Sequence, residues 1–417
     1  MKTEMKSIKT LADFYKSMRL LHEIRVKIVS KITNSEILNM KDLKSLEQIK
    51  DQLLAIPKKK DLFKLKTIQG QSILLELDYE LGELERDNVF LKHGYKALKQ
   101  YMCKIHNNYL EDVNRGLDFL KRHQYKHFVT DRDGTISNYC GRYQSSVQPI
   151  YNALCLSEFA KTIEGQSIIL TSAPLLDMGL ADISVQPENE YILAGSKGRE
   201  ILINGKKQVY PIAETEQQKL DELNYAIDSL LKNQEYATFK YIGSGLQHKF
   251  GQTTLARQDK NNSILDEKSL ALKKKIESLL NDLDPNEQFF SLEDTGKDLE
   301  IMLKIKSDKD NLEEFDKGHG LKFIMNHLDE NIQNQRVLIC GDTASDVHLI
   351  TAAQDLGAIV TTVFVTEDET LKNSVKSICK DSFFVSSPDV LIYMFFKYSK
   401  HNQSWKNPLS LFLSLIN

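Results

Sequence analysis

Four short apolar segments constrain the fold of this chain more than any other feature of its sequence. They lie at residues 127–130, 167–170, 336–340 and 359–365, and helical patterns fill the intervals between them. Continuously apolar strands that alternate with helices are typical of a parallel sheet covered on both faces. The sequence therefore predicts an α/β fold with a parallel-sheet core, in which ligands bind beyond the carboxyl ends of the strands.

Residues 1–120 have a helical pattern instead. Apolar side chains recur at intervals of three or four residues, first at Leu11, Phe14 and Met18 and again from Leu74 to Leu84, and Pro57 marks a break. No alternation typical of strands is apparent, so we predict a bundle of amphipathic helices over this stretch. Two interpretations stay open: a self-contained spacer, and a module for self-association or protein docking.

A third pattern occupies residues 206–305. Polar helices are expected at 216–232 and 268–282, and an alternating strand at 298–305. We interpret this stretch as an α+β domain inserted into the parallel-sheet core. The core itself would then consist of residues 121–205 and 306–417.

The composition excludes several classes of protein. The 417 residues include 55 Lys+Arg and 58 Asp+Glu, and the net charge of -3 argues against a chain that mainly neutralises nucleic-acid phosphates. Residues 1–18 lack the apolar run of a signal peptide, and no apolar stretch reaches the length of a membrane span. The five cysteines are scattered without a CxxC pair, which is typical of a reducing compartment. We expect a soluble, cytoplasmic protein without nucleic-acid or membrane partners.

An acidic motif, Asp131-Arg132-Asp133-Gly134-Thr135, directly follows the first apolar segment. The first carboxylate would project from the end of the strand and the second would lie one turn further on. Glycine allows the backbone to turn sharply and to approach a ligand closely. The motif alone is also compatible with an Asp-rich turn that ends in glycine.

A second acidic loop, Gly341 to Asp346, follows the third apolar segment and contains Asp342. Like charges gathered at one edge of a sheet are unfavourable unless a cation compensates for them. Hard oxygen ligands are those that Mg²⁺ prefers, so the two loops together predict a magnesium site. Thr171 offers a hydroxyl at another strand end, and the Lys317 ammonium could neutralise a phosphate or the nucleophile.

These motifs, in this order, resemble the haloacid dehalogenase (HAD) superfamily of phosphotransferases. More closely, the chain resembles the trehalose-6-phosphate phosphatase family, in the form with a helical N-terminal extension. The resemblance covers about residues 125–395 and rests on Val129–Gly134, Gln148–Tyr151, Leu170–Thr171, Pro174–Leu175, Gly195–Glu200, Gly243–Gln247, Lys317–Gly320 and Ile339–Asp346. It implies a HAD-like Rossmannoid core with an inserted α+β cap of the C2 type.

The resemblance also implies residue roles. Asp131 would be the nucleophile that forms an aspartyl-phosphate, and Asp133 the general acid and then the general base. Mg²⁺ would be held by Asp131, the main-chain carbonyl of Asp133 and Asp342, with its waters held by Asp346. Thr171 and Lys317 would bind the phosphate oxygens. The substrate would be a small sugar phosphate, trehalose 6-phosphate.

The cap would close over the site and supply contacts to the sugar. The candidates for these contacts are Arg199, Gln247, Lys249, Arg257 and Glu300. Three positions depart from the usual family pattern. Arg132 replaces a residue that is commonly apolar or aromatic, Lys197 replaces an aromatic residue or His, and Met302 lies where an acidic residue is common.

Other functions remain to be weighed against this one. The same phosphatase chemistry would also act on another sugar phosphate or on a phosphoprotein. Activity measured over a panel of substrates distinguishes these possibilities. A non-catalytic scaffold built on the N-terminal helices is disfavoured because all four parts of the motif set are intact. A metal-dependent glycosyltransferase also uses a DxD motif, but Gly134, Thr135 and the second acidic loop disfavour it.

Overall fold

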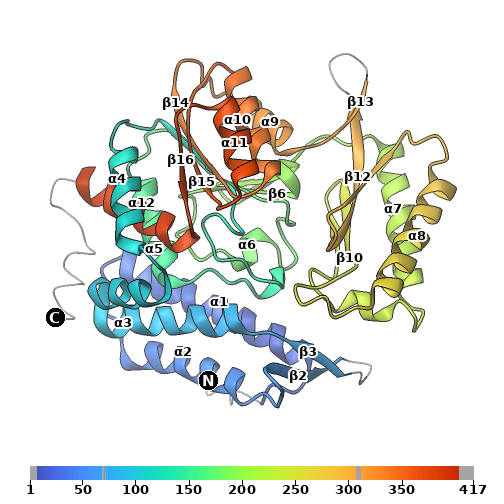
Figure 1. Cartoon of the computed structure of the whole chain (residues 1–417), viewed down its shortest axis with the longest axis horizontal. Helices are drawn as coiled ribbons and strands as arrows, with labels where there is room; N and C mark the ends of the chain where they lie inside the picture. Colours follow the sequence, from blue (N-terminus) through green and yellow to red (C-terminus); the bar gives the residue numbers. More distant parts are fainter. Residues whose placement is uncertain (1–6, 68–69, 71, 307–310, 403–417) are drawn as a thin grey trace.

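The computed structural model describes residues 7–67, 70, 72–306 and 311–402. Residues 1–6 of the expected bundle and residues 307–310 and 403–417 of the expected core lie outside the described residues. A helical bundle, a central sheet domain and a separate smaller sheet domain are visible in Figure 1. Within the described ranges, no helix combines the length and the apolar character that crossing a membrane requires.

The central sheet has eight strands in the order β16-β15-β14-β4-β5-β6-β7-β8. Their bounds are β4 His127–Thr130, β5 Ser167–Leu170, β6 Ile192–Gly195, β7 Glu200–Ile203, β8 Lys206–Val209, β14 Arg336–Gly341, β15 Ile359–Val365 and β16 Ser382–Val385. The strands from β16 to β6 pair in parallel, whereas β7 and β8 pair antiparallel. This arrangement confirms the predicted α/β fold and all four predicted strands.

Helices cover both faces of this sheet (Figure 1). They are α5 Ile150–Ala160, α6 Leu180–Ile183, α9 Lys317–His327, α10 Ala344–Asp355, α11 Glu369–Ile378 and α12 Pro388–Asn402. Successive residues of β4 serve opposite faces: Phe128 packs with Phe159 of α5 and Phe395 of α12, while Val129 packs in the cluster of α9 and α10. Because both faces are buried there, the four predicted strands are mostly apolar, which is why the sequence revealed them.

The N-terminal part is a bundle of α1 Leu11–Thr33, α2 Met40–Leu54, α3 Asp78–Ile105 and α4 Tyr109–Leu120. The prediction of helix alone was wrong, because β1 Lys58–Lys59, β2 Leu62–Lys66 and β3 Ser72–Leu75 form a three-stranded antiparallel sheet. Leu74 lies in β3 rather than on a helical stripe. In β2, Phe63 and Leu65 are buried while Lys64 and Lys66 are exposed, an alternation that the sequence does contain.

Bundle and core share one hydrophobic cluster. Tyr95 of α3 stacks on Phe396 of α12 with ring centroids 4.2 Å apart. Residues of α1, such as Phe14 and Met18, belong to the same buried cluster as Phe128 of β4. The bundle is therefore packed directly against the domain that carries the acidic motifs.

The cap contains an antiparallel sheet in the order β11-β12-β10-β9, with β13 paired to β12. Its elements are α7 Glu214–Leu230, β9 Leu246–Lys249, β10 Gln252–Ala256, α8 Asp266–Leu283, β11 Phe290–Asp294, β12 Asp298–Lys306 and β13 Leu312–Glu314. Figure 1 shows the sheet on the side of the core and α7 and α8 on the outside. By its pairing, residues 206–209 (β8) extend the core sheet rather than the inserted domain.

Candidate functional site

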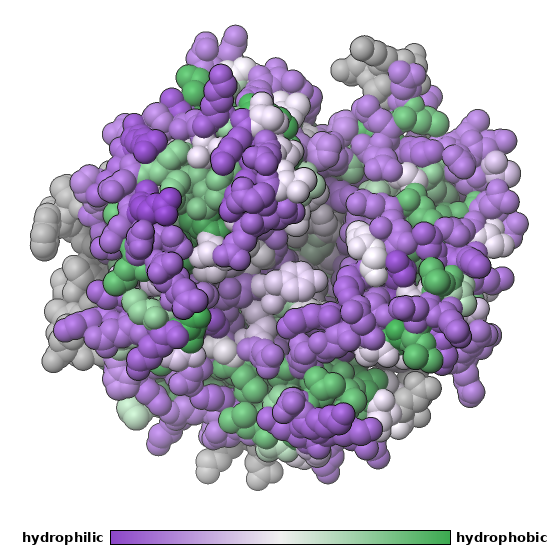
Figure 2. Space-filling view, in the orientation of Figure 1, coloured by the Kyte–Doolittle hydropathy of each residue, from purple (hydrophilic) through white to green (hydrophobic). Residues whose placement is uncertain are grey.

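Three adjacent strands bring the predicted motifs to one edge of the core sheet. In the order β14-β4-β5, the residues after the strand ends are Asp342, Asp131 and Thr171. Parallel strands end at the same edge, so side chains that are far apart in sequence become neighbours. A cavity of about 590 Å³ lies here between core and cap, and Figure 2 shows a hollow in the surface along this boundary. Its volume is within the range of ligand sites, roughly 300–1,000 Å³.

The carboxylates of the two acidic loops converge. Oxygens of Asp131, Asp342 and Asp346 all lie within 4.8 Å of one another. The approach is close enough to require glycine at position 134, where φ is +89° and a Cβ would lie 2.1 Å from Oδ2 of Asp342. The sequence prediction that both loops meet at one point is therefore met by the geometry.

Lys317 is the cationic partner of this group. It is the first residue of α9, and its Nζ lies 2.6 Å from Oδ1 of Asp131 and 2.5 Å from Oδ1 of Asp346. The Lys317 side chain is 3% exposed, and Asp131 and Asp346 hold the pKa of its ammonium above the ordinary value of lysine despite the burial. The site thus contains a fixed positive charge beside the first aspartate of the motif.

One ammonium does not neutralise three carboxylates. Burial raises the pKa of Asp131 to about 7, and Asp346 and Asp133 add to the rise while Lys317 opposes it. Burial also raises the pKa of Asp342 to about 9, with Asp131 and Asp346 contributing. Grouped carboxylates that resist ionisation in this way form a donor set for a hard divalent cation, whose charge would favour their ionised form.

Hydrogen bonds hold the acidic side chains in place. Oδ2 of Asp346 accepts from the backbone N–H groups of Asp342 and Thr343, each at 3.0 Å. The Thr135 hydroxyl donates to Oδ1 of Asp342 at 3.0 Å. Thr135 was missed as a site residue, although its place in the first acidic motif could have identified it.

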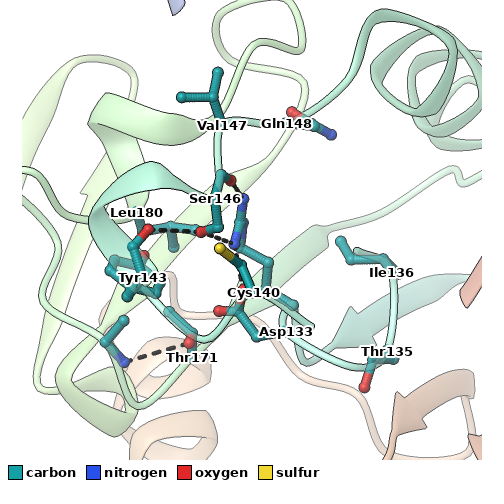
Figure 3. A network of polar contacts seen from close by, with 12 residues as sticks. Asp133, Thr135, Ile136, Cys140, Tyr143, Ser146, Val147, Gln148, Thr171 and Leu180 are labelled. Atoms are coloured by element: carbon teal, nitrogen blue, oxygen red, sulfur yellow. Dashed lines mark hydrogen bonds and ion pairs between the residues drawn. The ribbon is translucent and has the colours of Figure 1, made fainter. Parts of the chain in front are cut away.

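The remaining predicted core residues also line the cavity. Asp133 carries a carboxyl whose pKa burial raises, against the opposing effect of Arg132 and Lys317. Thr171 follows β5, and its hydroxyl accepts a bond from the backbone N–H of Ala173 at 3.3 Å. Figure 3 shows the side chains of Asp133 and Thr171 in the same region of the core.

The cap supplies a polar wall opposite these residues. Gln247 and Lys249 on β9 and Glu300 on β12, for which the resemblance implied sugar contacts, line the cavity. Burial lowers the pKa of Lys249, and Glu300 acts against this effect. Although burial alone would raise the pKa of Glu300, Lys249 and Lys197 hold it below its ordinary value.

Two departures from the family pattern meet in the structure. Nζ of Lys197, on the core side in the 3-10 helix η2 Ser196–Gly198, lies 3.3 Å from Oε2 of Glu300 and 3.0 Å from Sδ of Met302. An ammonium and a carboxylate thus pair across the boundary between core and cap. Both partners line the cavity, Lys197 from the core and Glu300 from the cap.

Two predicted sugar-binding residues do not line the cavity. Arg257 follows β10 and is paired with Asp294 at 2.7 Å and with the Ser269 hydroxyl at 2.8 Å, so its guanidinium braces the cap internally. Arg199 is 1% exposed and donates to the main-chain oxygen of Leu303 in β12 at 2.6 Å. Arg199 therefore joins core and cap instead of facing the cavity.

Comparisons with known proteins place the chain in a family. Residues 128–391 match the family model of the trehalose-6-phosphate phosphatase C-terminal region, and residues 10–109 match that of the trehalose-6-phosphate phosphatase N-terminal helical bundle domain. The chain belongs to the trehalose-6-phosphate phosphatase family. Both halves of the match agree with the bundle and the sheet domain described above.

Two curated relatives of the chain come from nematodes. An Aphelenchoides avenae alpha,alpha-trehalose-phosphate synthase (UDP-forming) 2 is 30% identical over 92% of this chain and 31% of the relative. A Caenorhabditis briggsae trehalose-phosphatase is 26% identical over 89% of this chain and 92% of the relative. The chain thus spans about a third of the length of the first relative and nearly all of the second.

Solved structures of the family resemble the chain at low sequence identity. The crystal structure of a trehalose-6-phosphate phosphatase related protein has a TM-score of 0.47 at 15% identity, covering 66% of this chain and 97% of that protein. The Candida albicans trehalose-6-phosphate phosphatase C-terminal domain has a TM-score of 0.46 at 15% identity, covering 69% and 96%.

Several cavity residues of this family member were not predicted from its sequence. They include Tyr139, Ser244, Glu293 and Asp298. The Ser244 hydroxyl is hydrogen-bonded to the Asp298 carboxylate, which ties the loop before β9 to the start of β12. Glu293 and Asp298 lie on the cap, where acidic side chains are common, so no feature of the sequence distinguished them from solvent-facing ones. Ser244 belongs to Gly243–Gln247, a stretch that carries the resemblance, and this could have identified it.

Proposed function

We propose that this chain is a phosphatase that hydrolyses trehalose 6-phosphate to trehalose and inorganic phosphate. The observation that supports this most directly is the convergence of Asp131, Asp342 and Asp346 within 4.8 Å, with Lys317 beside them. Asp131, Asp342 and Lys317 line the cavity, and Asp346 lies buried behind them. Charges arranged in this way suit phosphoryl transfer, in which positioning and charge neutralisation carry most of the catalysis. Membership of the family favours trehalose 6-phosphate over other sugar phosphates.

A magnesium ion fits the donor set. Asp131, the main-chain carbonyl of Asp133 and Asp342 would hold the ion, and Asp346 would hold its waters. The side chain of Asp346 is already engaged by Lys317 and by two backbone N–H groups, which suits an outer position. When bound, the ion supplies positive charge that offsets the repulsion between a carboxylate and a phosphate dianion.

The reaction would proceed in two steps on the aspartates of the first motif. Asp131 attacks the phosphorus atom and forms an aspartyl-phosphate, while Asp133 donates a proton to the departing sugar oxygen. Asp133 then takes a proton from water, which hydrolyses the aspartyl-phosphate and restores Asp131. Lys317 keeps Asp131 oriented through its contact of 2.6 Å and, with Thr171, binds phosphate oxygens.

The cap, expected over residues 206–305, would select the sugar. Gln247, Lys249 and Glu300 offer an amide, an ammonium and a carboxylate on one wall of the cavity. Such groups favour a substrate rich in hydroxyls, because a substrate without them leaves these buried polar groups unpaired.

A phosphate-release assay tests the proposal. The chain is incubated with Mg²⁺ and a panel of sugar phosphates and one phosphopeptide, with trehalose 6-phosphate expected as the best substrate. A chelator should abolish the activity, and Asp131→Asn should lower kcat by at least about 10³-fold because the nucleophile is lost. Asp118→Asn, an exposed substitution on α4, is the matched control. Unchanged turnover in Asp131→Asn would remove the covalent route, and preference for another panel member would change the substrate.

A further inference from the structure

Arg132 lies between the two aspartates of the first acidic motif and is almost fully buried, with 2% of its surface exposed. The family resemblance led us to expect an apolar or aromatic residue here, so the fold does not demand a charge. A buried guanidinium is unfavourable unless it is paired and hydrogen-bonded. Its ion-pair partner is Asp133, whose Oδ1 lies 2.5 Å from Nη1 of Arg132.

The guanidinium is fixed by a second set of contacts. Nη1 also donates to the Ser146 hydroxyl at 3.0 Å, and Nη2 donates to the Ser146 main-chain oxygen. The Ser146 hydroxyl in turn donates to the main-chain oxygen of Tyr143 at 2.7 Å. Figure 3 shows Ser146 and Tyr143 on the loop beside Asp133. Because a guanidinium is planar, these contacts fix its orientation, and with it the direction in which Nη1 donates to the Asp133 carboxylate.

The loop that holds Arg132 is itself anchored on the N-terminal bundle. The main-chain oxygen of Val147 accepts from Nη1 of Arg25 in α1 at 2.6 Å. Arg25 is paired with Asp87 of α3 at 2.8 Å, and Asp87 accepts from the backbone N–H of Ile150 at 2.7 Å. Two helices of the bundle thus hold the segment that includes Ser146.

We propose that Arg132 is a positioning residue, which holds the Asp133 carboxylate through Oδ1 so that Oδ2 is directed to the oxygen of the leaving sugar. The inference rests on the proposed function, since it assigns the geometry of the proposed general acid. Arg132 does not contact the substrate in this proposal; it acts through Asp133. Through Ser146, Val147 and Arg25, the bundle contributes to the same geometry.

The test compares two leaving groups in the first turnover. A sugar alcohol needs a proton to depart, whereas p-nitrophenol departs as a stable anion and depends less on a general acid. With enzyme in excess and Mg²⁺ present, the release of each leaving group is measured for Arg132→Met, Arg132→Lys and the unaltered chain. Release in the first turnover excludes the hydrolysis of the aspartyl-phosphate, in which Asp133 also acts.

We expect Arg132→Met to slow the release of the sugar about 10- to 100-fold, because part of the contribution of the general acid is lost. The release of p-nitrophenol should slow by less than about threefold. Arg132→Lys keeps the charge but loses the planar fork, and it should recover part of the sugar rate. The apparent affinity for the sugar phosphate should change little in either variant. Equal losses with both substrates, or no loss with either, would overturn the proposal.

A second pair of variants covers the case in which Arg132→Met does not fold. Ser146→Ala removes one bond to the guanidinium, whereas Ser145→Ala changes the neighbouring serine, whose hydroxyl donates to the main-chain oxygen of Arg142 at 2.9 Å. Only Ser146→Ala should slow sugar release relative to p-nitrophenol release, and equal behaviour of the two would contradict the proposal. If the unaltered chain released phosphate from no substrate, the proposed function would be wrong. If it were active but the variants slowed both leaving groups equally or not at all, only the positioning role of Arg132 would be wrong.

Discussion

Gly134 shows at the scale of one residue how closely the two acidic loops approach each other. A methyl group at this position would lie 2.1 Å from Oδ2 of Asp342. The positive φ of +89° adds a conformational reason for glycine, since other residues pay roughly 1–2 kcal/mol in the left-handed region. An alanine at position 134 would thus both strain the backbone and displace the Asp342 carboxylate, and a second glycine with positive φ but no close neighbour separates the two effects.

Gly134→Ala is expected to lower kcat by at least about 10²-fold, because shifting Asp342 by about 1 Å disrupts the acidic group. Gly296→Ala is the control, as Gly296 has a φ of +82° but no atom within 4 Å of its added methyl group. Both variants should lose thermal stability because of the positive φ, and Gly134→Ala should lose more because it also displaces Asp342. Only Gly134→Ala should lose activity in the phosphate-release assay. Equal activity in the two variants would contradict the close approach of the loops.

At the scale of elements, α3 carries an unusual number of acidic residues into the interface between bundle and core. Glu80, Glu83 and Asp87 are all buried. Burial raises the pKa of Glu80 to about 7, although the Ser145 hydroxyl and Arg142 oppose the rise. Cys140 of the loop beside the cavity lies against the same carboxyl, with Sγ 3.9 Å from Oε1. We therefore expect the stability of the interface that α3 forms with the core to depend on pH.

The sign of this effect follows from the raised pKa. The folded chain keeps a proton on Glu80 that the unfolded chain loses near pH 4.5, so the stabilisation is full below pH 4.5 and is lost as the pH rises to about 7. A shift of this size corresponds to about 3 kcal/mol. The free energy of unfolding of Glu80→Gln, measured in denaturant relative to that of the unaltered chain, should therefore be about 3 kcal/mol more favourable to the folded state at pH 8 than at pH 4.5.

Glu85→Gln on the same helix provides the control, because the side chain of Glu85 is 40% exposed and pairs with Lys50. The difference between this variant and the unaltered chain should stay nearly constant over the same pH interval. A constant difference for Glu80→Gln as well would show that Glu80 is ionised in the folded chain.

At the scale of the whole molecule, the cavity exists only because the cap lies over the core. Lys197 on the core side and Glu300 on the cap side pair at 3.3 Å across the boundary. Arg199 adds a hydrogen bond from the core to the main chain of β12. The polar wall of the cap thus depends on contacts that neither domain makes alone.

Glu300→Gln should raise KM for trehalose 6-phosphate by about tenfold or more, because a charged partner of Lys197 and Lys249 is lost from the cavity wall that we propose contacts the sugar. For p-nitrophenyl phosphate, which lacks the sugar, KM should change by less than about threefold. The same substitution at Glu277, on the outer helix α8 where it pairs with Lys273, is the control. A similar rise in KM with both substrates would show that Glu300 acts on the phosphate end of the site instead.

The sequence alone determined the strands that are buried on both faces and the loops that follow them. Residues 127–130, 167–170 and 359–365 were predicted with the bounds that the structure has, because unbroken apolar runs leave few alternatives. Since parallel strands end at one edge, the sequence placed Asp131 and Asp342 at the same edge of the sheet. The direct pairing of β4 with β14, which makes the two residues neighbours, belongs to the sheet topology.

Only the tertiary structure decided how side chains with several available partners are used. The sequence shows only that Arg257 is a cationic residue of the cap, whereas the structure pairs it with Asp294 inside the cap. Lys197 and Met302 are far apart in the chain, but folding brings them into contact. The partner of a long, flexible side chain depends on which neighbours folding brings within reach and on how deeply they are buried. Those quantities belong to the packed molecule, and local sequence patterns do not encode them.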